Sequence, residues 1–452
     1  MEWIYFGVLI GIIIVVFLVV KRPMYEAMAI GFFVIVFMLG KTGSLGVYFK
    51  NTVSFYALYM IAAFIIFGAV FEKSGLIVDM IDIVVALVGR FSGGAGYVAL
   101  LASSAMGALS ATGPGNAAAV GTITIPAMKR TGFSAELAAT IEMAASSLGP
   151  IIPPSNTIVI MFTILESIYP GKYSFSQYWM FSWVIALWFV FHRFLTLFFL
   201  IRRNHVQPVP EEERLPLREA LRKGWQSLLL PVAVFLPLFI EAVFHDTVIT
   251  NQLGSAGASN FTAILLETVP SLCVLFIMVL CKKKKHVITI GKLTDFVYGS
   301  VNSTAPVIVM VFFGFAISEV FSDAGVIDSI ATSISGADIP LWAVVWISPL
   351  IFTLLGMFLE GTAIIMMFGS IFISLAASVG IHPMLAAAMV NAMSYAMGHM
   401  TPPFALCFFV CLGIAESDFV KTTKITVLWC VTQYFLSVLL LYNLLPMFGM
   451  LI

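Results

Sequence analysis

The sequence GPIIPP over Gly149–Pro154 returns as GHMTPP over Gly398–Pro403, so one Gly-x-x-x-Pro-Pro motif occurs twice in the chain. Each copy lies inside an otherwise apolar stretch, where consecutive prolines remove backbone donors and interrupt a helix. At membrane depth, freed backbone groups are tolerated only where protein or a water-filled cavity satisfies them. Two such interruptions at corresponding places in two halves are the best sequence indication of the binding site of a secondary transporter.

The composition indicates a membrane protein with many spans. The chain has 452 residues, of which 61% are hydrophobic and 10% are charged. Apolar stretches of about 20 residues recur along it, each long enough to cross a bilayer. The 23 basic and 23 acidic residues balance, so the net charge suggests no nucleic-acid partner. The five cysteines have no metal-ligand spacing, and no cofactor is expected.

Eight apolar stretches are predicted to span the lipid bilayer, with two motif regions between them. Each motif region has two apolar arms followed by a Pro-Pro element. An unbroken helix through a Pro-Pro element would be about 50 Å long against a hydrocarbon core of about 30 Å, so a crossing broken at the prolines fits better. The predicted spans are about 4–20, 25–40, 52–71, 178–201, 226–244, 260–281, 296–320 and 425–445. The motif regions divide into about 94–111, 116–128 and 134–168, and about 341–359, 361–378 and 383–415.

The distribution of Lys and Arg predicts the topology, because cytoplasmic loops carry an excess of these residues. Suppose that the N-terminus lies outside, that the two arms of each motif region form a re-entrant hairpin, and that each Pro-Pro element crosses once. Then 19 of the 23 Lys and Arg residues lie on the cytoplasmic side. An extra crossing in either region would reverse the loops that follow. We therefore expect both termini outside, and hairpins that enter from opposite sides.

Further correspondences indicate a duplicated chain. Val70–Ile77 (VFEKSGLI) matches Val320–Ile327 (VFSDAGVI) at an offset of 250 residues, and Gly132 and Gly380 precede the two broken crossings. We expect an all-α polytopic membrane protein with two inverted-topology repeats, each containing a re-entrant hairpin and a Pro-Pro-broken helix.

The predicted domain organisation follows from this duplication. The first repeat covers residues 1–201 and the second covers 226–452. Residues 202–225 form a cytoplasmic amphipathic linker, which we expect to lie against the membrane surface.

Oxygen-bearing residues at the first hairpin turn and after the first break are candidate ligands. Ser110 and Asn116 flank a glycine-rich turn, and oxygen ligands suit a hard cation such as sodium. Helix halves that begin after the breaks point free N–H groups inward, which suits an anionic substrate. The candidate substrate-binding residues are Asn116, Ser155, Asn156, Thr157 and Thr401.

Three ionisable residues stand out in apolar surroundings. Glu360 lies at the second hairpin turn, Glu142 before the first break and His399 inside the second. A charge at a helix centre costs about 2.5–3.5 kcal/mol, so such residues usually face a cavity and a partner. Glu360 could bind sodium or a proton, or lie at a tip near water. Glu142 and His399 are candidate proton or ion groups, although Glu142 could equally pair with a neighbouring helix.

The ordered motifs resemble the large membrane subunit of tripartite ATP-independent periplasmic (TRAP) transporters over nearly the whole chain. The resemblance implies an elevator mechanism, with a transport domain (about 72–168 and 322–415) moving against a scaffold. It also implies sodium coupling, and carboxylate substrates delivered by a periplasmic binding protein. It implies a bacterial inner-membrane location and a four-span small membrane subunit. The motifs are Phe64–Gly68, Lys73–Gly75, Gly121–Lys129, Gly149–Ser155 and Gly398–Pro403.

The resemblance also assigns sodium ligands to the hairpin tips and breaks. They would be Ser110, Gly115 and Asn116 with Gly149 and Pro150, and then Glu360 and Gly361 with Gly398 and Thr401.

We therefore interpret the sequence as an ion-coupled secondary transporter subunit for small organic anions, with sodium as the coupling ion. The alternative is a stand-alone proton-coupled carrier or antiporter of the same superfamily. An enzyme is not expected, because the chain has no His-Glu-x-x-His motif and no convincing serine or paired-aspartate signature. The absence of a Gly-x-x-x-x-Gly-Lys-Ser/Thr loop argues against ATP hydrolysis.

Overall fold

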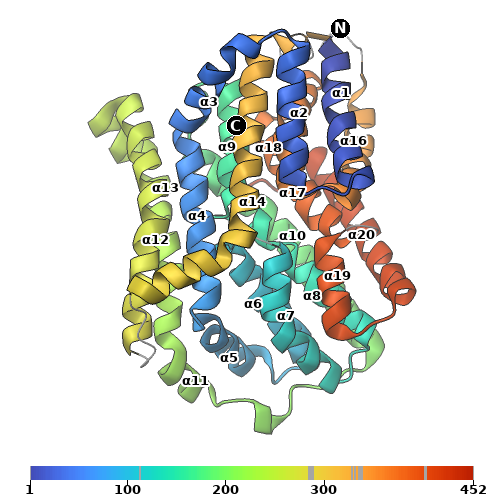
Figure 1. Ribbon diagram of the computed structural model, residues 1–452. Helices are drawn as coiled ribbons and strands as arrows, with labels where there is room; N and C mark the ends of the chain where they lie inside the picture. Colours follow the sequence, from blue (N-terminus) through green and yellow to red (C-terminus); the bar gives the residue numbers. More distant parts are fainter. Residues whose placement is uncertain are drawn as a thin grey trace.

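The computed structural model describes residues 2–110, 113–283, 290–326, 329, 332–333, 339–401 and 405–450, and the regular secondary structure in these ranges is helical (Figure 1). Among the described residues, seven helices are long and apolar enough to cross a membrane, or eight if the bent pair α8–α9 is one span. The chain is therefore an all-helical protein with many membrane spans.

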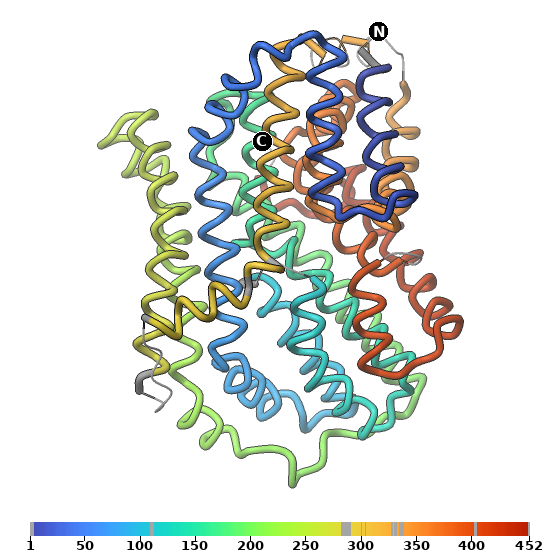
Figure 2. Tube along the Cα trace, in the orientation of Figure 1, coloured from blue at the N-terminus to red at the C-terminus, as the bar shows by residue number. Residues whose placement is uncertain are grey.

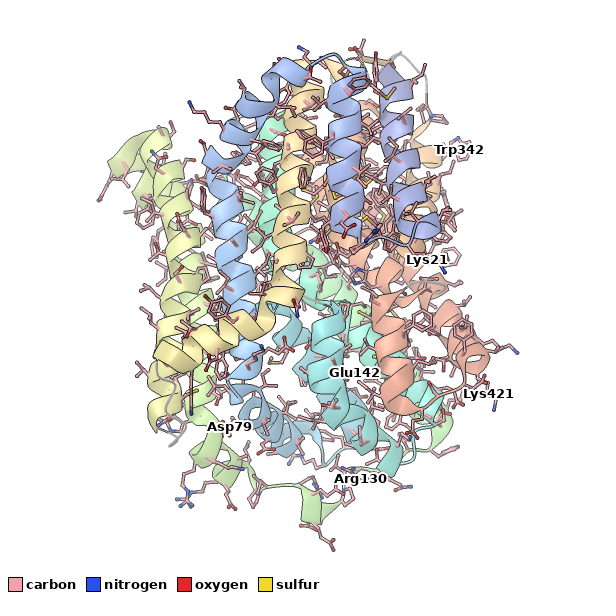
Figure 3. The ribbon with its side chains drawn as sticks, viewed as in Figure 1. Lys21, Asp79, Arg130, Glu142, Trp342 and Lys421 are labelled. Carbon is pink, nitrogen blue, oxygen red and sulfur yellow. The ribbon has the colours of Figure 1, made fainter. Side chains whose placement is uncertain are left out.

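Of the first helices, α1–α3 lie in the upper half of the molecule, and α4 runs from there into the lower half (Figure 1). Lys21 lies at the junction of α1 and α2, at about mid-height (Figure 3). The helices are α1 (Glu2–Ile14, continued by a π turn over Val15–Val19), α2 (Met24–Met38), α3 (Leu45–Ser54) and α4 (Tyr56–Lys73).

The first motif region follows. Helices α6 and α7 pack against each other as a hairpin in the lower half, and α8 and α9 meet at a bend of 44° (Figure 1). The helices are α5 (Leu76–Val88), α6 (Gly94–Ser110), α7 (Gly113–Arg130), α8 (Ala135–Ser146), α9 (Asn156–Ile168) and α10 (Phe175–Asn204).

The chain then passes along the lower end of the molecule and returns upward beside α4 (Figure 2). Within α13, Gly254 has φ 72° and ψ 169°, so this helix is interrupted there. The helices are α11 (Leu217–Gly224), α12 (Leu229–Phe244), α13 (Thr250–Lys283) and α14 (Ile290–Asp323).

The second motif region has the reverse placement. Its hairpin, α16 and α17, lies in the upper half, whereas α19 reaches into the lower half (Figure 1). The helices are α16 (Leu341–Phe358), α17 (Gly361–Ser378), α18 (Pro383–Ala392, continued by a π turn over Met393–Met397), α19 (Leu406–Ala415) and α20 (Phe419–Leu441).

The helix positions predicted from hydropathy and the Pro-Pro motifs agree with the structure to within about six residues, except that α13 begins at Thr250 rather than near residue 260. Both breaks interrupt helices as expected: Ile152 is extended (φ −91°, ψ 120°) and so is Thr401 (φ −100°, ψ 114°). Pro402 and Pro403 lie outside the described residues.

Glycines at matching places adopt the same backbone conformation. Gly132 and Gly380, before the two broken crossings, have φ 95° and 87°. Gly75 and Gly325, in the matched segments that follow α4 and α14, have φ 73° and 67°. Positive φ at these turns favours glycine, which explains why the residue type recurs at each pair of positions.

Candidate functional site

The two hairpins contact the two breaks through pairs of glycines. A Cβ added at Gly107 of α6 would lie 2.6 Å from the Cα of Gly149, and one added at Gly356 of α16 would lie 2.2 Å from the Cα of Gly398. Both pairs are backbone-to-backbone contacts, which no side chain can relieve by moving. Gly356 follows Gly107 by 249 residues, and Gly398 follows Gly149 by the same number. The same packing of hairpin against break therefore occurs in both halves.

In the second half, Glu360 joins the hairpin tip to the break. Its carboxylate caps α17 by accepting from the backbone N–H of Thr362 at 2.7 Å, and it accepts from the Tyr395 hydroxyl at 3.3 Å. The hydroxyls of Thr362 and Tyr395 are 2.6 Å apart. The Glu360 side chain is 27% exposed, so it keeps an open side for a ligand.

His399 lies between the tips of both hairpins. Its Nε2 accepts from the backbone N–H of Gly361 at 3.3 Å and is 4.0 Å from Glu360. On its other side, a Cβ added at Gly113 of α7 would lie 3.1 Å from Nδ1 of His399 and 2.8 Å from the Sγ of Cys407. The two halves therefore meet here, and the side chain of His399 is 97% buried, at 3% exposure.

Glu360 and His399 line a cavity of about 380 Å³. The opposite wall comes from the α1–α2 junction (Phe17, Pro23, Tyr25) and from Pro306–Met310 of α14. Among the described residues that line it, Glu360 is the one acidic side chain and there is no Lys or Arg. A small anion entering this space would meet a carboxylate, and would need a cation to accompany it.

In the first half, Asn116 lies at the meeting of tip and break. Its Nδ2 donates to the carbonyl of Ser103 at 2.6 Å, and lies 2.9 Å from the position of a Cβ on Gly107. Its Oδ1 is buried and has no partner among the described residues, so it is available as a ligand oxygen. Ser110 ends α6 and Gly115 lies in the first turn of α7, which places both at the tip.

Two of the predicted substrate-binding residues after the first break make hydrogen bonds within the break. The hydroxyls of Ser155 and Thr157 both donate to the carbonyl of Pro150, Ser155 at 2.5 Å, and Asn391 Nδ2 donates to the same oxygen at 3.3 Å. These hydroxyl hydrogens are occupied in holding the break. Asn156 keeps a buried Oδ1 without a partner in the described part of the chain.

The hydroxyl of Thr401 contacts the π turn after α18 and helix α20. Its hydroxyl donates to the carbonyl of Met397 at 2.7 Å and is 3.8 Å from the Sγ of Cys430 on α20. Neither contact involves the second hairpin tip, whereas Gly361 lies at that tip and Gly398 contacts the hairpin through Gly356.

Glu142, on α8, contacts both arms of the first hairpin. Its carboxyl group accepts from Ser103 of α6, from Thr124 of α7 at 2.5 Å and from Ser146 of its own helix at 3.0 Å. It is completely buried, and it does not line the cavity that contains Glu360. Its contacts fit a buried acid that joins three helices. Figure 3 shows it on α8, in the lower half of the molecule.

Sequence reasoning missed three residues at the centre: Gly107, Tyr395 and Asn391. Each is 249 residues from a residue of the other half, namely Gly356, Ser146 and Glu142. The 249-residue spacing between the halves could have identified these positions. Using it required the knowledge that each hairpin tip contacts a break, which the sequence does not give.

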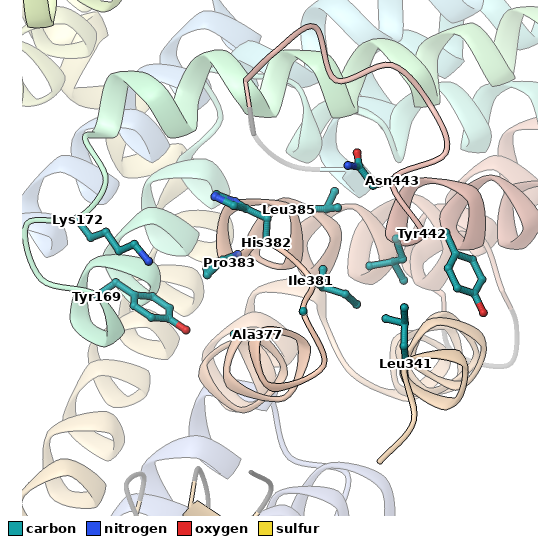
Figure 4. A pocket seen from close by; sticks show the side chains of 12 residues that line it. Tyr169, Lys172, Leu341, Ala377, Ile381, His382, Pro383, Leu385, Tyr442 and Asn443 are labelled. Carbon is teal, nitrogen blue, oxygen red and sulfur yellow. The ribbon is translucent and has the colours of Figure 1, made fainter. Parts of the chain in front are cut away.

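A second cavity, of about 550 Å³, opens at the upper end of the molecule, between the α9–α10 turn and the start of α18 (Figure 4). Lys172 and His382 lie at its rim, together with Asn443 after α20. Burial, and then the charge of Lys172, lower the pKa of His382. Since this cavity contains no hairpin tip or break residue among its lining, it is separate from the central site.

The fold is similar to that of a solved membrane transporter. The structure superposes on that of the YdaH transporter of Alcanivorax borkumensis with a TM-score of 0.65, covering 89% of this chain and 88% of that one at 16% identity. At this identity the likeness shows a shared fold.

The sequence places the chain within one family. Residues 11–447 match the family described as "Tripartite ATP-independent periplasmic transporter, DctM component", so the chain belongs to it. It is a multi-pass permease of the TRAP type, and not an enzyme. The resemblance noted from the motifs is confirmed.

Two relatives show the range within the family. The chain is 26% identical to the C4-dicarboxylate TRAP transporter large permease protein DctM of Pseudomonas aeruginosa, over 88% of this chain and 86% of that protein. It is 22% identical to the sialic acid TRAP transporter large permease protein SiaM of Vibrio cholerae, over 89% of each chain. Both relatives are named for organic acids.

Proposed function

We propose that this chain carries small organic anions, such as carboxylates, across the bacterial inner membrane, and that inward movement of sodium drives the transport. The cavity beside the second hairpin tip carries the argument. It contains Glu360 and, among its described lining, no Lys or Arg side chain. An anion can enter such a site only with a cation, and the substrates named for the relatives are anions.

Sodium fits the oxygen atoms that the tips and breaks present. The Glu360 carboxylate is partly exposed, and the side-chain oxygen of Asn116 has no partner among the residues that the structure describes. Hard cations prefer carboxylate and carbonyl ligands, and the ends of broken helices supply backbone carbonyls. We assign the coupling ions to the two tip–break contacts. Each sodium ion moving inward would contribute about 2.3 kcal/mol per 100 mV of membrane potential.

We infer an elevator movement between two bodies. The central cavity lies between the tip and break of the second half and a wall made by the α1–α2 junction and α14. The scaffold would contain α1–α4 and α12–α14. The transport body would contain residues 72–168 and 322–415, and we add α10 and α20 because they contact the breaks.

The opposed placement of the hairpins supports inverted repeats, with both chain ends on the outer side (Figure 1). With that orientation the α1–α2 junction is the cytoplasmic end of these helices, so a cavity that it lines opens inward. We therefore interpret the structure as the inward-facing state.

A proton-coupled carrier is the second candidate, and one observation favours it. His399 Nε2 accepts from Gly361 N–H, so a proton arriving there would displace this hydrogen bond and turn the ring nitrogen toward Glu360 as a donor. Proton binding would thus loosen the second hairpin tip.

The family description also implies other components. We propose a periplasmic binding protein and a four-span small membrane subunit as partners, with the bilayer covering the exposed apolar helix faces.

The test is uptake into proteoliposomes that contain the chain with its partner subunits. Radiolabelled succinate and N-acetylneuraminic acid are the probes, under a sodium gradient at fixed pH and under a pH gradient without sodium. We expect uptake with the sodium gradient alone. Uptake driven only by the pH gradient would establish the proton-coupled alternative.

A partner-independent measurement complements it. The thermal unfolding temperature of the purified chain should rise with NaCl and not with KCl, since a ligand that binds the folded state stabilises it. Equal curves in the two salts would count against sodium sites in this chain.

A further inference from the structure

Arg193, in the middle of α10, is a fully buried cation that has no acidic partner in the part of the chain that the structure describes. It is 0% exposed and is among the largest completely buried side chains. No carboxylate of the described residues lies within 4.0 Å of it. Arginine stays charged in proteins, so something else must stabilise this guanidinium.

Its contacts reach both breaks. The Nη2 group donates to the carbonyl of Ala396 at 2.8 Å and to the hydroxyl of Ser147 at 3.4 Å. It lies 3.1 Å from the sulfur of Met400, and the guanidinium stands 5.5 Å from the ring centre of Trp429 on α20. Ser147 and Ala396 are 249 residues apart, the same offset that relates the glycine pairs. One side chain therefore holds equivalent positions of the two halves.

Both positions are C-terminal ends of helices. Ser147 is the C-cap of α8, and Ala396 lies in the π turn that ends α18. Unpaired carbonyls give a helix C-terminus a partial negative charge of about half an electron, and a cation placed there is stabilised. Two such ends facing one guanidinium can replace the missing carboxylate.

The guanidinium also has spare donors. Its Nε and Nη1 are buried and have no partner among the described residues. Leaving such donors unsatisfied is costly, so a merely structural residue at this position would be expected to be apolar or fully hydrogen-bonded.

We propose that Arg193 is a positioning residue that ties the two breaks together, so that cation binding at one hairpin tip is transmitted to the other. The inference rests on the proposed sodium coupling. Each break also contacts its hairpin, through Gly149 in the first half and Gly398 in the second. Without the Arg193 contacts, cation binding would order each break independently of the other.

The variants Arg193→Met and Arg193→Lys test this, with Arg202→Met as a matched control. Arg202 is on the same helix but exposed, stacked on Phe198 at 4.3 Å. In the sodium dependence of uptake, Arg193→Met should lower the Hill coefficient toward one and raise the half-saturating sodium concentration about tenfold, the size of a typical coupling between sites. The KM for substrate at saturating sodium should change less than twofold. Arg193→Lys should restore part of the effect, and Arg202→Met should match the wild type.

A second measurement does not depend on the coupling ion. Amide hydrogen exchange in residues 143–151 and 393–401 should rise together in Arg193→Met, because one side chain holds both segments. Faster exchange in only one segment, or wild-type sodium dependence in a folded Arg193→Met protein, would overturn the proposal. If Arg193→Met does not fold, the same two readouts on Arg193→Lys decide. If the wild type itself shows no sodium dependence, the proposed function fails, and the exchange experiment still tests the tie.

Discussion

The two halves of the molecule share one backbone arrangement and place their acids differently. In the first half the acid, Glu142, lies behind the hairpin, and three hydroxyl groups donate to it. In the second half the position 249 residues later is Asn391, and the acid Glu360 lies at the hairpin tip beside the cavity. The glycine contacts between tip and break are the same in both.

This difference indicates that the shared glycine contacts have a structural role, whereas the acidic side chains differ in role between the halves. The shared contacts involve glycine backbones and fix where a hairpin tip can meet a break. The acidic residues near these contacts differ between the halves. In the first half the acid joins helices, and in the second half it faces the cavity, where it can contact a ligand. A carboxyl group enclosed by hydroxyls joins helices, whereas a partly open one can bind a cation.

The largest loss of uptake is expected at the glycine contacts between hairpin and break, which the two halves share. Gly398→Ala places a Cβ 2.5 Å from the Cα of Gly356, and Gly149→Ala places one 2.4 Å from the Cα of Gly107. Because the neighbouring atoms are backbone, tip and break must separate. Uptake should fall about a hundredfold or more in both variants, as expected for a displacement of about 1 Å at a site.

Gly413→Ala in α19 is the matched control for these substitutions. A Cβ there has nothing within 4 Å, so uptake should be unchanged. Substantial uptake by Gly398→Ala or Gly149→Ala would show that the tip–break contact is not needed for transport.

The next effect separates the two acids. Glu360→Gln keeps the size of the side chain and removes the charge that faces the cavity. Sodium-dependent uptake should fall about tenfold to a hundredfold, the range of a coupling of 1–3 kcal/mol, with normal amounts of folded protein. Stabilisation of the purified protein by NaCl should also weaken. Wild-type rates and wild-type sodium dependence would remove Glu360 from the ion site.

The sequence predicted the elements of this site better than its contacts. Proline pairs, hydropathy and charge asymmetry are local or additive signals, and they located both breaks and both hairpins. Ser155 was predicted as a substrate-binding residue, and its hydrogen bond to the carbonyl of Pro150 was not foreseen. Its actual partner depends on how the chain turns within the break, and a list of residue types does not contain that information.

Contacts between residues far apart in the sequence could not be predicted for the same reason, because a list of residue types does not specify partners. The partners of Arg193 could not be inferred from the sequence, because a sequence shows adjacency along the chain only. Its true partners are Ser147 and Ala396, which lie 46 and 203 residues away. Only the packing of α10 against both breaks brings these groups together.

A smaller effect is expected for the acid of the first half. Glu142→Gln should lower the free energy of unfolding by about 1–3 kcal/mol, since a group that accepts three hydrogen bonds becomes one that must also donate. The half-saturating sodium concentration of the folded protein should stay close to that of the wild type. Thermal unfolding and sodium-dependent uptake together measure the two quantities. A changed ion or pH dependence with unchanged stability would instead identify Glu142 as an ion or proton group.

The smallest effect is expected at the carbonyl of Pro150, where three donors share one acceptor. Ser155→Ala leaves the Thr157 hydroxyl and Asn391 Nδ2 in place. The free energy of unfolding should therefore fall by less than about 1 kcal/mol, with uptake within about twofold of the wild type. The double variant Ser155→Ala/Thr157→Ala should lose more than the two single variants combined, because the carbonyl is then left with one long contact. Strict additivity, measured by thermal unfolding, would mean that each hydroxyl stabilises the break independently. A large loss of uptake in Ser155→Ala alone, with unchanged stability, would return this hydroxyl to the substrate site.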